Sequence, residues 1–388
     1  CIRDRLTPIQ AAMVNCHGSQ CGFCTPGFVV TMHSMVERDV HLDAEALRYG
    51  LSGNLCRCTG YSQIIDAGKS VQCEKVARLS QIYAEQPILE EFKRLADDPV
   101  RLEGEQTIFV PRTLEAAVEF KAAFSAATIV SGATDYGVLH NHGRTVPADL
   151  LCLSSVDAFD SIITERDRLR IGGGATWTQI ENHIESLFPP YHQIVTRFGS
   201  PQIRNSGTLA GNLATGSPIA DSIPFHLVMD SSLQLVSSRG MREVSLNEFY
   251  TGYRENIMAD DELIAEVATP LLAPDERLAA YKISKRRDMD ISTLTLALWV
   301  KLHESLITDA RLAVGGVGPT VVRISASEEH LQGKTLSESA LREAGAIART
   351  QISPWSDVRG GADYRLQLTE NLMVKAYHEF AGELMAHA

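Results

Sequence analysis

Two segments decide the N-terminal fold of this 388-residue chain: G-S-Q-C-G-F-C-T-P-G (Gly18–Gly27) and G-N-L-C-R-C-T-G-Y (Gly53–Tyr61). Each segment holds a close pair of cysteines, and the four thiols belong to Cys21, Cys24, Cys56 and Cys58. Two such pairs on two loops are a typical arrangement of metal ligands. The sequence therefore predicts a metal site formed by these four thiols.

Helix-start signals surround both loops. Thr-Pro pairs are typical of an N-cap followed by proline at the first helical position, and Asp or Ser before an apolar run is a further cap signal. The predicted caps are Thr7, Thr25, Asp43 and Ser62. We therefore expect a small all-α bundle with the metal at one end.

The spacing of the second pair bears on which metal is bound. One residue separates Cys56 from Cys58, whereas paired zinc ligands usually have two or more residues between them. A separation of one residue suits two cysteine ligands that share one iron of a cluster. From spacing alone, a [2Fe-2S] cluster is favoured, with structural zinc, a disulfide pair or unligated thiols as alternatives. The further cysteines Cys16, Cys73 and Cys152 suit a reducing compartment, which weighs against disulfides.

The runs HGSQCGFCTPGF (His17–Phe28) and GNLCRCTGY resemble the helical [2Fe-2S] domain of the xanthine dehydrogenase family of molybdenum hydroxylases. The resemblance extends over nearly the whole chain, and the domain order is similar to that of the small, iron-sulfur and flavin subunits of bacterial xanthine dehydrogenases. It implies that the four cysteines ligate one [2Fe-2S] cluster.

Cys1 raises a separate question. Family members carry a plant-type ferredoxin domain ahead of the helical domain, and the last ligand of that domain is a cysteine near this position. The resemblance thus implies that Cys1 is the final ligand of a second cluster, in a domain that precedes it on this polypeptide or on a separate chain. The alternative is that Cys1 is an arbitrary terminus.

Composition limits the class of protein. With 44% hydrophobic and 22% charged residues the chain is an ordinary globular protein, and its length predicts two or three domains. A formal net charge of -12 argues against a nucleic-acid partner, which requires a basic face. The longest apolar runs are shorter than the ~18 residues of a membrane span, so we expect no membrane association and a cytoplasmic location.

Changes in pattern along the chain divide it into four parts. After the all-α bundle comes a polar, charged stretch with breakers, in which we expect a short helix at Ile88–Ala96 and no strand. Alternating helix and strand signals then predict an α+β domain, and long alternating runs followed by helices predict a second one. The expected bounds are 1–73 for the bundle, 74–105 for a linker, 106–275 for the first α+β domain and 276–388 for the C-terminal α+β domain.

Small residues are concentrated in two loops of the first α+β domain. Ser131–Asp135 follows the predicted strand Thr128–Val130, and a longer run from Phe198 to Asp221 is rich in glycine and hydroxyl side chains. Such loops allow close approach of the backbone to a phosphate, but they are equally compatible with plain turns, and a Rossmann G-x-G-x-x-G is absent. The basic segment 281–291 is either a solvated charge run or part of the same site.

The resemblance implies that these loops form a non-Rossmann FAD site. The residues carried over as FAD contacts are Ile129, Val130, Gly132, Ala133, Thr134, Asp135, Phe198, Thr208, Gly211, Asn212, Thr215, Asp221, Ile264, Lys282, Asp290 and Ile291. Family members commonly have glycine and asparagine at Ser131 and Ala133, and glycine at Ala210. By contrast, Trp177 and His183 are expected to be packing and surface residues.

Further strands and helices are expected in the C-terminal part. Leu294–Leu302 alternates as a half-buried strand, with Ile307–Gly316 as its partner, and helices begin near Ser337 and Ala362.

A cluster and a flavin in one chain imply electron transfer, because the cluster carries single electrons and FAD collects two. No catalytic base or nucleophile is evident, so the resemblance implies a partner subunit that binds molybdopterin, in a dimer of heterodimers, and NAD as acceptor. The substrate expected is hypoxanthine or xanthine. The alternatives are an aldehyde, nicotinate or aromatic hydroxylase of the same family, and a zinc-binding protein without enzymatic activity.

Overall fold

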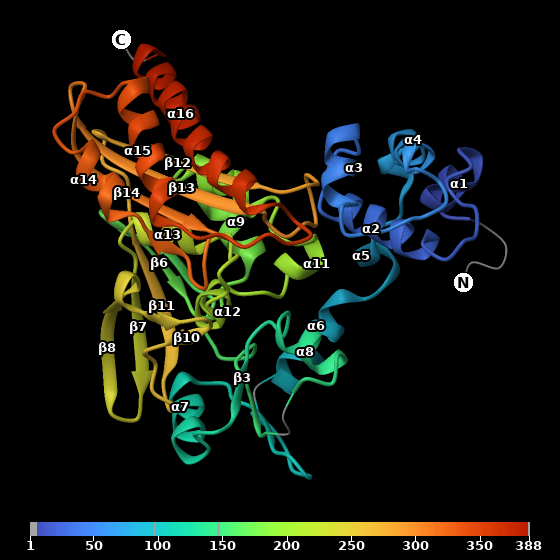
Figure 1. Cartoon of the computed structure of the whole chain (residues 1–388). Helices are drawn as coiled ribbons and strands as arrows, with labels where there is room; N and C mark the ends of the chain where they lie inside the picture. Colours follow the sequence, from blue (N-terminus) through green and yellow to red (C-terminus); the bar gives the residue numbers. More distant parts are fainter. Residues whose placement is uncertain (1–5, 97, 146–147, 387–388) are drawn as a thin grey trace. The chain divides into compact units, whose positions relative to one another are not determined.

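The structure, a computed structural model, describes residues 6–96, 98–145 and 148–386 (Figure 1). Cys1 lies outside the described residues. The chain divides into two compact units, one formed by Cys1–Asp98 and Ser200–Gln202 and the other by Pro99–Gly199 and Ile203–Ala388.

The first unit is helical, as predicted. Four helices form its body: α1 (Pro8–Asn15), α2 (Thr25–Glu37), α3 (Ala44–Gly50) and α4 (Ser62–Ser70). Their apolar faces enclose one core, in which the fully buried side chains include Ile9, Phe28, Met32, Leu47 and Ile64. Each such side chain stabilises the fold by about 1.5–3 kcal/mol relative to exposure.

Two of the four predicted helix caps are confirmed. Thr7 and Gln10 form a reciprocal capping box, in which the backbone N–H of Gln10 donates to Thr7 Oγ1 at 3.3 Å. Asp43 Oδ1 accepts hydrogen bonds from two backbone N–H groups of α3 at 2.9 Å. Both caps satisfy donors that a helix N-terminus leaves unpaired.

The other two caps are wrong by one residue. Cys24 takes the N-cap of α2 and Thr25 is its first helical residue, with its hydroxyl donating to Ser19 Oγ at 2.7 Å. Tyr61, in a left-handed conformation, precedes α4, which begins at Ser62. In both cases the helix extends one residue closer to the cysteine loops than the cap signal indicated.

Short elements follow the four helices: η1 (Cys73–Lys75), α5 (Leu79–Ile82) and α6 (Glu85–Ala96). The prediction that residues 74–105 contain no strand is wrong. Strand β1 (Val100–Leu102) pairs antiparallel with β2 (Ile108–Val110). All three residues of β1 are exposed, so no apolar alternation marks this strand in the sequence.

The second unit contains three sheets. The first sheet joins β1 and β2 to the parallel strands β4 (Leu150–Cys152) and β3 (Thr128–Val130). Helix α7 (Leu114–Ala123), capped by Thr113, contacts this sheet. Helix α8 (Tyr136–Asn141) follows β3 after the small-residue loop.

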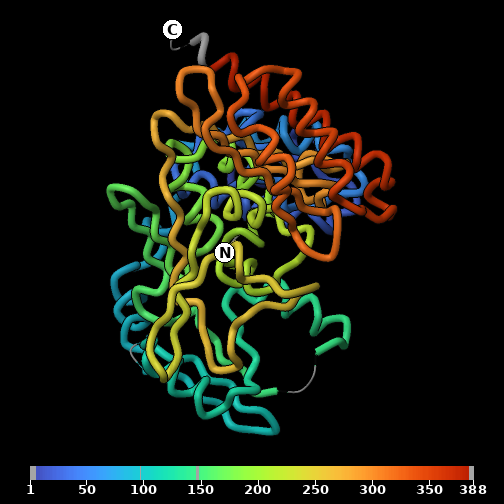
Figure 2. The backbone as a smooth tube through the Cα atoms, turned by 60° about the vertical axis from the view of Figure 1, so that its left-hand side comes forward, coloured from blue at the N-terminus to red at the C-terminus, as the bar shows by residue number. Residues whose placement is uncertain are grey.

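The second sheet is antiparallel, in the order β5 (Ile162–Thr164), β6 (Arg168–Gly172), β11 (Leu263–Pro270), β7 (Ser232–Ser237) and β8 (Gly240–Ser245). Figure 2 shows the β7–β8 hairpin as a long yellow loop at the edge of this sheet. The chain between β6 and β7 forms α9 (Trp177–Ile184), α10 (Pro189–Val195), α11 (Pro201–Arg204), α12 (Leu209–Thr215) and α13 (Ile223–Val228). After β8 come η2 (Leu246–Glu248) and a small hairpin of β9 (Tyr250–Gly252) and β10 (Glu255–Asn256).

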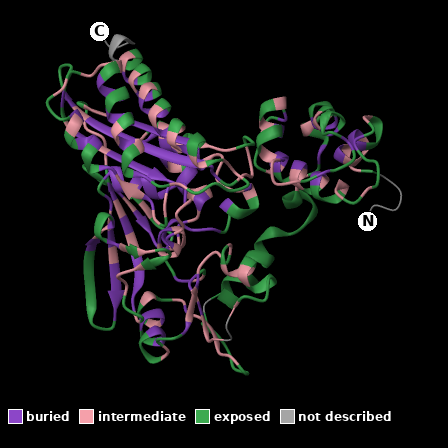
Figure 3. Cartoon of the chain, viewed as in Figure 1, coloured by how far each residue is buried: buried purple, intermediate pink, exposed green. Residues whose placement is uncertain are grey.

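The third sheet is antiparallel, in the order β12 (Glu276–Ile283), β13 (Leu294–His303), β14 (Leu306–Gly315) and β15 (Val322–Arg323). It is followed by α14 (Ser325–Leu331), α15 (Glu338–Gln351) and α16 (Ala362–Ala386), of which the last two begin where predicted. The expectation that 294–302 is half-buried is wrong: eight of the ten residues of β13 are buried, on both faces (Figure 3). Helices α13 and α16 both contact this strand, so both of its faces are covered.

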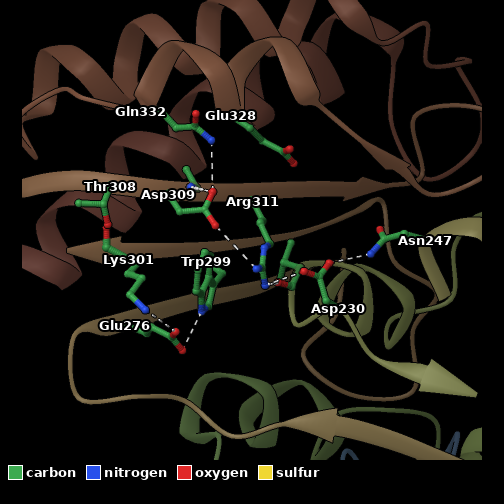
Figure 4. Close-up of polar contacts among 12 residues, drawn as sticks. Asp230, Asn247, Glu276, Trp299, Lys301, Thr308, Asp309, Arg311, Glu328 and Gln332 are labelled. Atoms are coloured by element: carbon green, nitrogen blue, oxygen red, sulfur yellow. Dashed lines mark hydrogen bonds and ion pairs between the residues drawn. The ribbon is translucent and has the colours of Figure 1, made fainter. Parts of the chain in front are cut away.

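An arginine connects the third sheet to the segment after α13 (Figure 4). Arg311 on β14 lies over the ring of Trp299, 4.0 Å from its centroid, and its Nη1 is 3.0 Å from Asp230 Oδ2. Asp230 in turn accepts a hydrogen bond of 2.8 Å from the side chain of Asn247. These contacts fix the second and third sheets in one unit.

The architecture is therefore a helical N-terminal part followed by α+β parts, in agreement with the expected fold class. None of the described helices is both long enough and apolar enough to cross a bilayer.

Candidate functional sites

The four predicted metal ligands come together in the first unit. Cys21 Sγ and Cys58 Sγ are 3.6 Å apart, and the side chains of Cys24 and Cys56 contact each other. Two thiolates bound to one tetrahedral metal at about 2.3 Å lie about 3.8 Å apart, so the first pair already has the separation of ligands on a shared iron. Across the described residues, no group of three His, Cys, Asp or Glu is arranged to hold a single metal ion.

The thiol pairs differ from the expectation from spacing. That expectation placed Cys56 and Cys58 on one iron, whereas each close pair takes one cysteine from each loop. The reason is that the two loops face each other, which brings Cys21 beside Cys58 and Cys24 beside Cys56.

Local hydrogen bonds prepare one of these thiols for ligation. Cys56 Sγ lies 3.1 Å from the hydroxyl of Thr59, and this hydrogen bond, with backbone N–H groups nearby, lowers the pKa of Cys56 to about 7. Burial raises the pKa of Cys24 to about 11. Cys56 therefore loses its proton more readily than Cys24. Because the thiolate is the form that binds a metal, Cys56 is the better prepared ligand of this pair.

A cavity of about 540 Å³ lies between the small-residue loops of the second unit. This volume is within the range of roughly 300–1,000 Å³ typical of small-molecule sites. Twelve of the predicted FAD contacts line it: Ile129, Val130, Gly132, Ala133, Thr134, Asp135, Phe198, Thr208, Gly211, Asn212, Thr215 and Ile264. A second, polar cavity of about 720 Å³ borders both loops, at Ser131, Gly132 and Ala133 of the first and at Thr208 of the second.

Gly132 is required where the two loops meet. A Cβ on this residue would lie 1.8 Å from the carbonyl oxygen of Ser206, a distance that no side chain tolerates. The next residue, Ala133, has φ +58°, a left-handed conformation that disfavours alanine. This explains in physical terms why glycine or asparagine would be more relaxed than alanine at position 133.

Helix α12 is the part of the site that the sequence described least well. The sequence predicts a small-residue loop here, yet Thr208 caps a seven-residue helix in which Leu209, Ala210 and Leu213 are buried. The opposite side presents Gly211 and Asn212 to the cavity. Asn212 Oδ1 accepts a hydrogen bond of 2.6 Å from Ser222, which leaves its amide nitrogen as a donor.

A buried arginine holds the loop that carries Phe198. Arg204 is 2% exposed, its Nε lies 2.9 Å from Glu181 on α9, and its Nη1 donates to the carbonyl oxygen of Phe198 at 3.2 Å. The Phe198 ring packs against Trp177, with 4.5 Å between centroids. Trp177 is buried, as expected, and it also lines the cavity.

Four predicted FAD contacts do not line the cavity: Asp221, Lys282, Asp290 and Ile291. Asp221 and Lys282 form a buried ion pair, and Ser292 donates a hydrogen bond to the other carboxylate oxygen of Asp221. Asp290 accepts from the backbone N–H of Arg286 at 2.9 Å within its own loop, and Ile291 is half exposed.

Sequence reasoning missed several lining residues, among them Tyr136, Ile203, Arg254 and Met258. Tyr136 directly follows the loop 131–135, so a wider window would have found it, and Ile203 lies within the run Phe198–Asp221 but is neither small nor polar. Arg254 and Met258 come from the β9–β10 hairpin and the segment after it, where no local pattern marks them.

Comparison with known proteins gives three domain matches. Residues 2–69 match a [2Fe-2S] binding domain, residues 102–272 the FAD binding domain in molybdopterin dehydrogenase, and residues 279–380 the CO dehydrogenase flavoprotein C-terminal domain.

Similar full-length proteins are much longer than this chain. The chain is 25% identical to xanthine dehydrogenase/oxidase of Gallus gallus, over 97% of this chain and 33% of that protein. It is 26% identical to aldehyde oxidase 4 of Rattus norvegicus, over 97% of this chain and 32% of that protein. The chain thus spans about a third of the length of these relatives.

Solved structures share the fold at low sequence identity. A chain of carbon monoxide dehydrogenase from Hydrogenophaga pseudoflava aligns with a TM-score of 0.67 at 22% identity, covering 72% of this chain and 97% of that one. A chain of quinoline 2-oxidoreductase from Pseudomonas putida 86 aligns with a TM-score of 0.66 at 22% identity, covering 71% and 96%. The three matches give the chain a [2Fe-2S] binding domain, an FAD binding domain of the kind found in molybdopterin dehydrogenase and a CO dehydrogenase flavoprotein C-terminal domain, in this order.

Proposed function

We propose that this chain is the iron-sulfur and flavin component of a xanthine dehydrogenase, which passes electrons from purine oxidation to NAD. One observation carries the proposal: two loops that bring four thiols into close pairs, and a cavity between glycine-rich loops, occur in the same chain. A cluster transfers single electrons, whereas a flavin collects two, so the pair converts one kind of electron flow into the other.

The residues present fit both groups. Cys21, Cys24, Cys56 and Cys58 would hold the [2Fe-2S] cluster, and the cavity residues from Ile129 to Ile264 would hold FAD. When bound, FAD would supply two-electron acceptance and hydride transfer. The chain's own contribution is to bind and orient the cofactor. The close approach of Gly132 to the backbone of Ser206 fixes the two loops against each other, and the side-chain amide of Asn212 offers a hydrogen-bond donor to the cofactor.

Asp221, Lys282 and Ser292 would act next to the cavity lining rather than in it. Their buried hydrogen bonds tie α13's N-terminal segment to β12 and to the start of β13, so we assign them to holding the FAD site in shape. Asp290 and Ile291 would lie at its exposed rim.

A partner subunit would supply the hydroxylation chemistry. The full-length relatives are about three times as long as this chain, so they contain regions beyond it, and we propose that the molybdopterin is bound by a partner subunit equivalent to those regions. We propose a dimer of such heterodimers in the cytoplasm, with NAD as the acceptor. The similarity to an aldehyde oxidase makes an aldehyde-oxidising complex the second candidate.

Co-purification of the chain with its partner tests the proposal. We expect a brown complex that contains iron and FAD and forms NADH on addition of hypoxanthine or xanthine. Turnover of aldehydes without turnover of purines would transfer the assignment to the second candidate. A colourless protein that contains zinc and no flavin would refute electron transfer altogether.

A further inference from the structure

The FAD cavity contains one cation that sequence reasoning did not assign. Among its lining residues, all within the described part of the chain, Arg254 is the only cationic side chain and Asp135 the only anionic one. We propose that Arg254 binds the pyrophosphate of a dinucleotide in this cavity. The inference rests on the proposed function, which places FAD there and names NAD as the acceptor.

The position of Arg254 is fixed by the β9–β10 hairpin, of which it forms the turn. Tyr250 donates to the carbonyl oxygen of Leu213 at 3.0 Å, and Asn256 donates to that of Ala214 at 3.1 Å. Both carbonyls belong to α12, the helix that presents Asn212 to the cavity. The hairpin is therefore attached to the cofactor-binding helix at both of its strands.

Close packing holds the turn against the end of α12. A Cβ at Gly216 would lie 3.1 Å from the ring of Tyr250 and 3.6 Å from Cα of Arg254, so the absence of a side chain at Gly216 allows this approach. Arg254 itself has φ +56°, a left-handed conformation that non-glycine residues adopt only at some cost. The backbone thus directs this side chain to the cavity at an energetic cost, as is common at ligand sites.

The present partner of Arg254 is weak. Its Nη1 is 3.8 Å from Asp135 Oδ2, beyond hydrogen-bond distance, and the two side chains are 39% and 50% exposed. Exposed pairs of this kind contribute little to stability, so the guanidinium can exchange Asp135 for a phosphate at little cost. A guanidinium also binds phosphate oxygens with two parallel hydrogen bonds, which a carboxylate at 3.8 Å does not receive.

Charge balance gives a second reason. The loop 131–135 is the predicted pyrophosphate cradle, and it carries the carboxylate of Asp135 beside two phosphates of like charge. Without a cation, that arrangement would repel the ligand. The guanidinium of Arg254 lies 3.8 Å from the Asp135 carboxylate of this loop, where its positive charge offsets the charge of both the carboxylate and the phosphates.

Replacement of Arg254 by Gln in the full-length chain, followed by titration with FAD and with riboflavin, tests the proposal. Gln keeps a similar stem and removes the charge. We expect about a tenfold or greater loss of FAD affinity and unchanged affinity for riboflavin, which has no phosphate. Arg254→Lys keeps the charge without the planar fork, so it should recover part of the loss.

Arg239→Gln is the matched control. Arg239 occupies the turn of the β7–β8 hairpin and pairs with Asp261, outside both cavities. We expect this variant to bind FAD as the wild type does. Thermal melting of all variants verifies that each is folded.

A second arm separates the two sources of phosphate. If Arg254→Gln leaves FAD affinity unchanged but raises the dissociation constant of NADH in flavin reduction about tenfold, the pyrophosphate bound is that of the second dinucleotide. Wild-type affinity for both FAD and NADH would overturn the inference, as would an equal loss for FAD and riboflavin. A wild-type chain that binds no FAD would refute the proposed function and the inference with it, whereas FAD and NADH binding that are both indifferent to Arg254 refute the inference alone.

Discussion

Replacement of Lys282 by Met should destabilise the second unit by about 3–5 kcal/mol, because it leaves a charged carboxylate buried without its cation. The side chains of Lys282 and Asp221 are 2% and 7% exposed, so water cannot replace the lost ammonium. Ser292 still donates to Asp221, but one neutral hydroxyl does not balance the charge. At roughly 2–4 °C per kcal/mol for a unit of this size, the melting temperature should fall by about 6–20 °C.

The control is Lys301→Met on the neighbouring strand β13. Lys301 is 44% exposed, and its Nζ lies 3.6 Å from Asp275 and 3.9 Å from Glu276, so its removal should cost less than about 1 kcal/mol. Melting would be followed by circular dichroism on the purified chain. The double variant Asp221→Asn/Lys282→Met, which removes both charges, should recover much of the loss. If Lys282→Met melts within about 2 °C of Lys301→Met, the ion pair does not stabilise the fold as we argue.

Three further substitutions test the sites directly. Asn212→Asp keeps the acceptor for Ser222 and adds a negative charge to the cavity, so flavin content after gel filtration should fall, with about a tenfold loss of affinity; full retention would show that this face of α12 lies away from the phosphates. Ala133→Asn places a residue that tolerates φ +58° in the loop 131–135 and should raise the free energy of unfolding by about 0.5–1 kcal/mol, seen as a higher melting temperature; a lower melting temperature would mean that the turn is not strained. Cys56→Ser should lose iron and keep flavin, as counted on the purified protein, because the thiol and the cavity belong to separate units; a full iron content would remove Cys56 from the ligand set.

Local signals predicted the elements that depend on neighbouring residues. The Thr7 cap and the Asp43 cap each mark a helix that the structure contains, since cap and helix lie within a few residues of each other. The four cysteines were found in the same way, although the thiols pair across the loops rather than within them.

Predictions failed where the environment of a strand or helix decides its structure. Strand β1 has three exposed residues and exists because β2 offers its edge, which no pattern within 100–102 reveals. The alternation of apolar residues at 294–302 predicted that one face of strand β13 is exposed to solvent, but helix α13 covers that face. In α12, Leu209 and Leu213 are four residues apart on one helical face, a signal that the glycines around them obscured.

The flavin cavity and the C-terminal sheet depend on each other in a way that a linear division of the chain does not show. The expected boundary between residues 275 and 276 follows the sheets, since β12 begins at Glu276. The largest hydrophobic core crosses that boundary, because Leu278 and Trp299 of the third sheet pack in one cluster with Ile194 and Phe225. The Lys282–Asp221 ion pair crosses it as well, from β12 to the residue that precedes α13 by two positions. Loosening the third sheet should therefore disturb the glycine-rich run that leads into α13. For this reason the Lys282–Asp221 ion pair, although outside the cavity lining, affects whether the cavity keeps its shape.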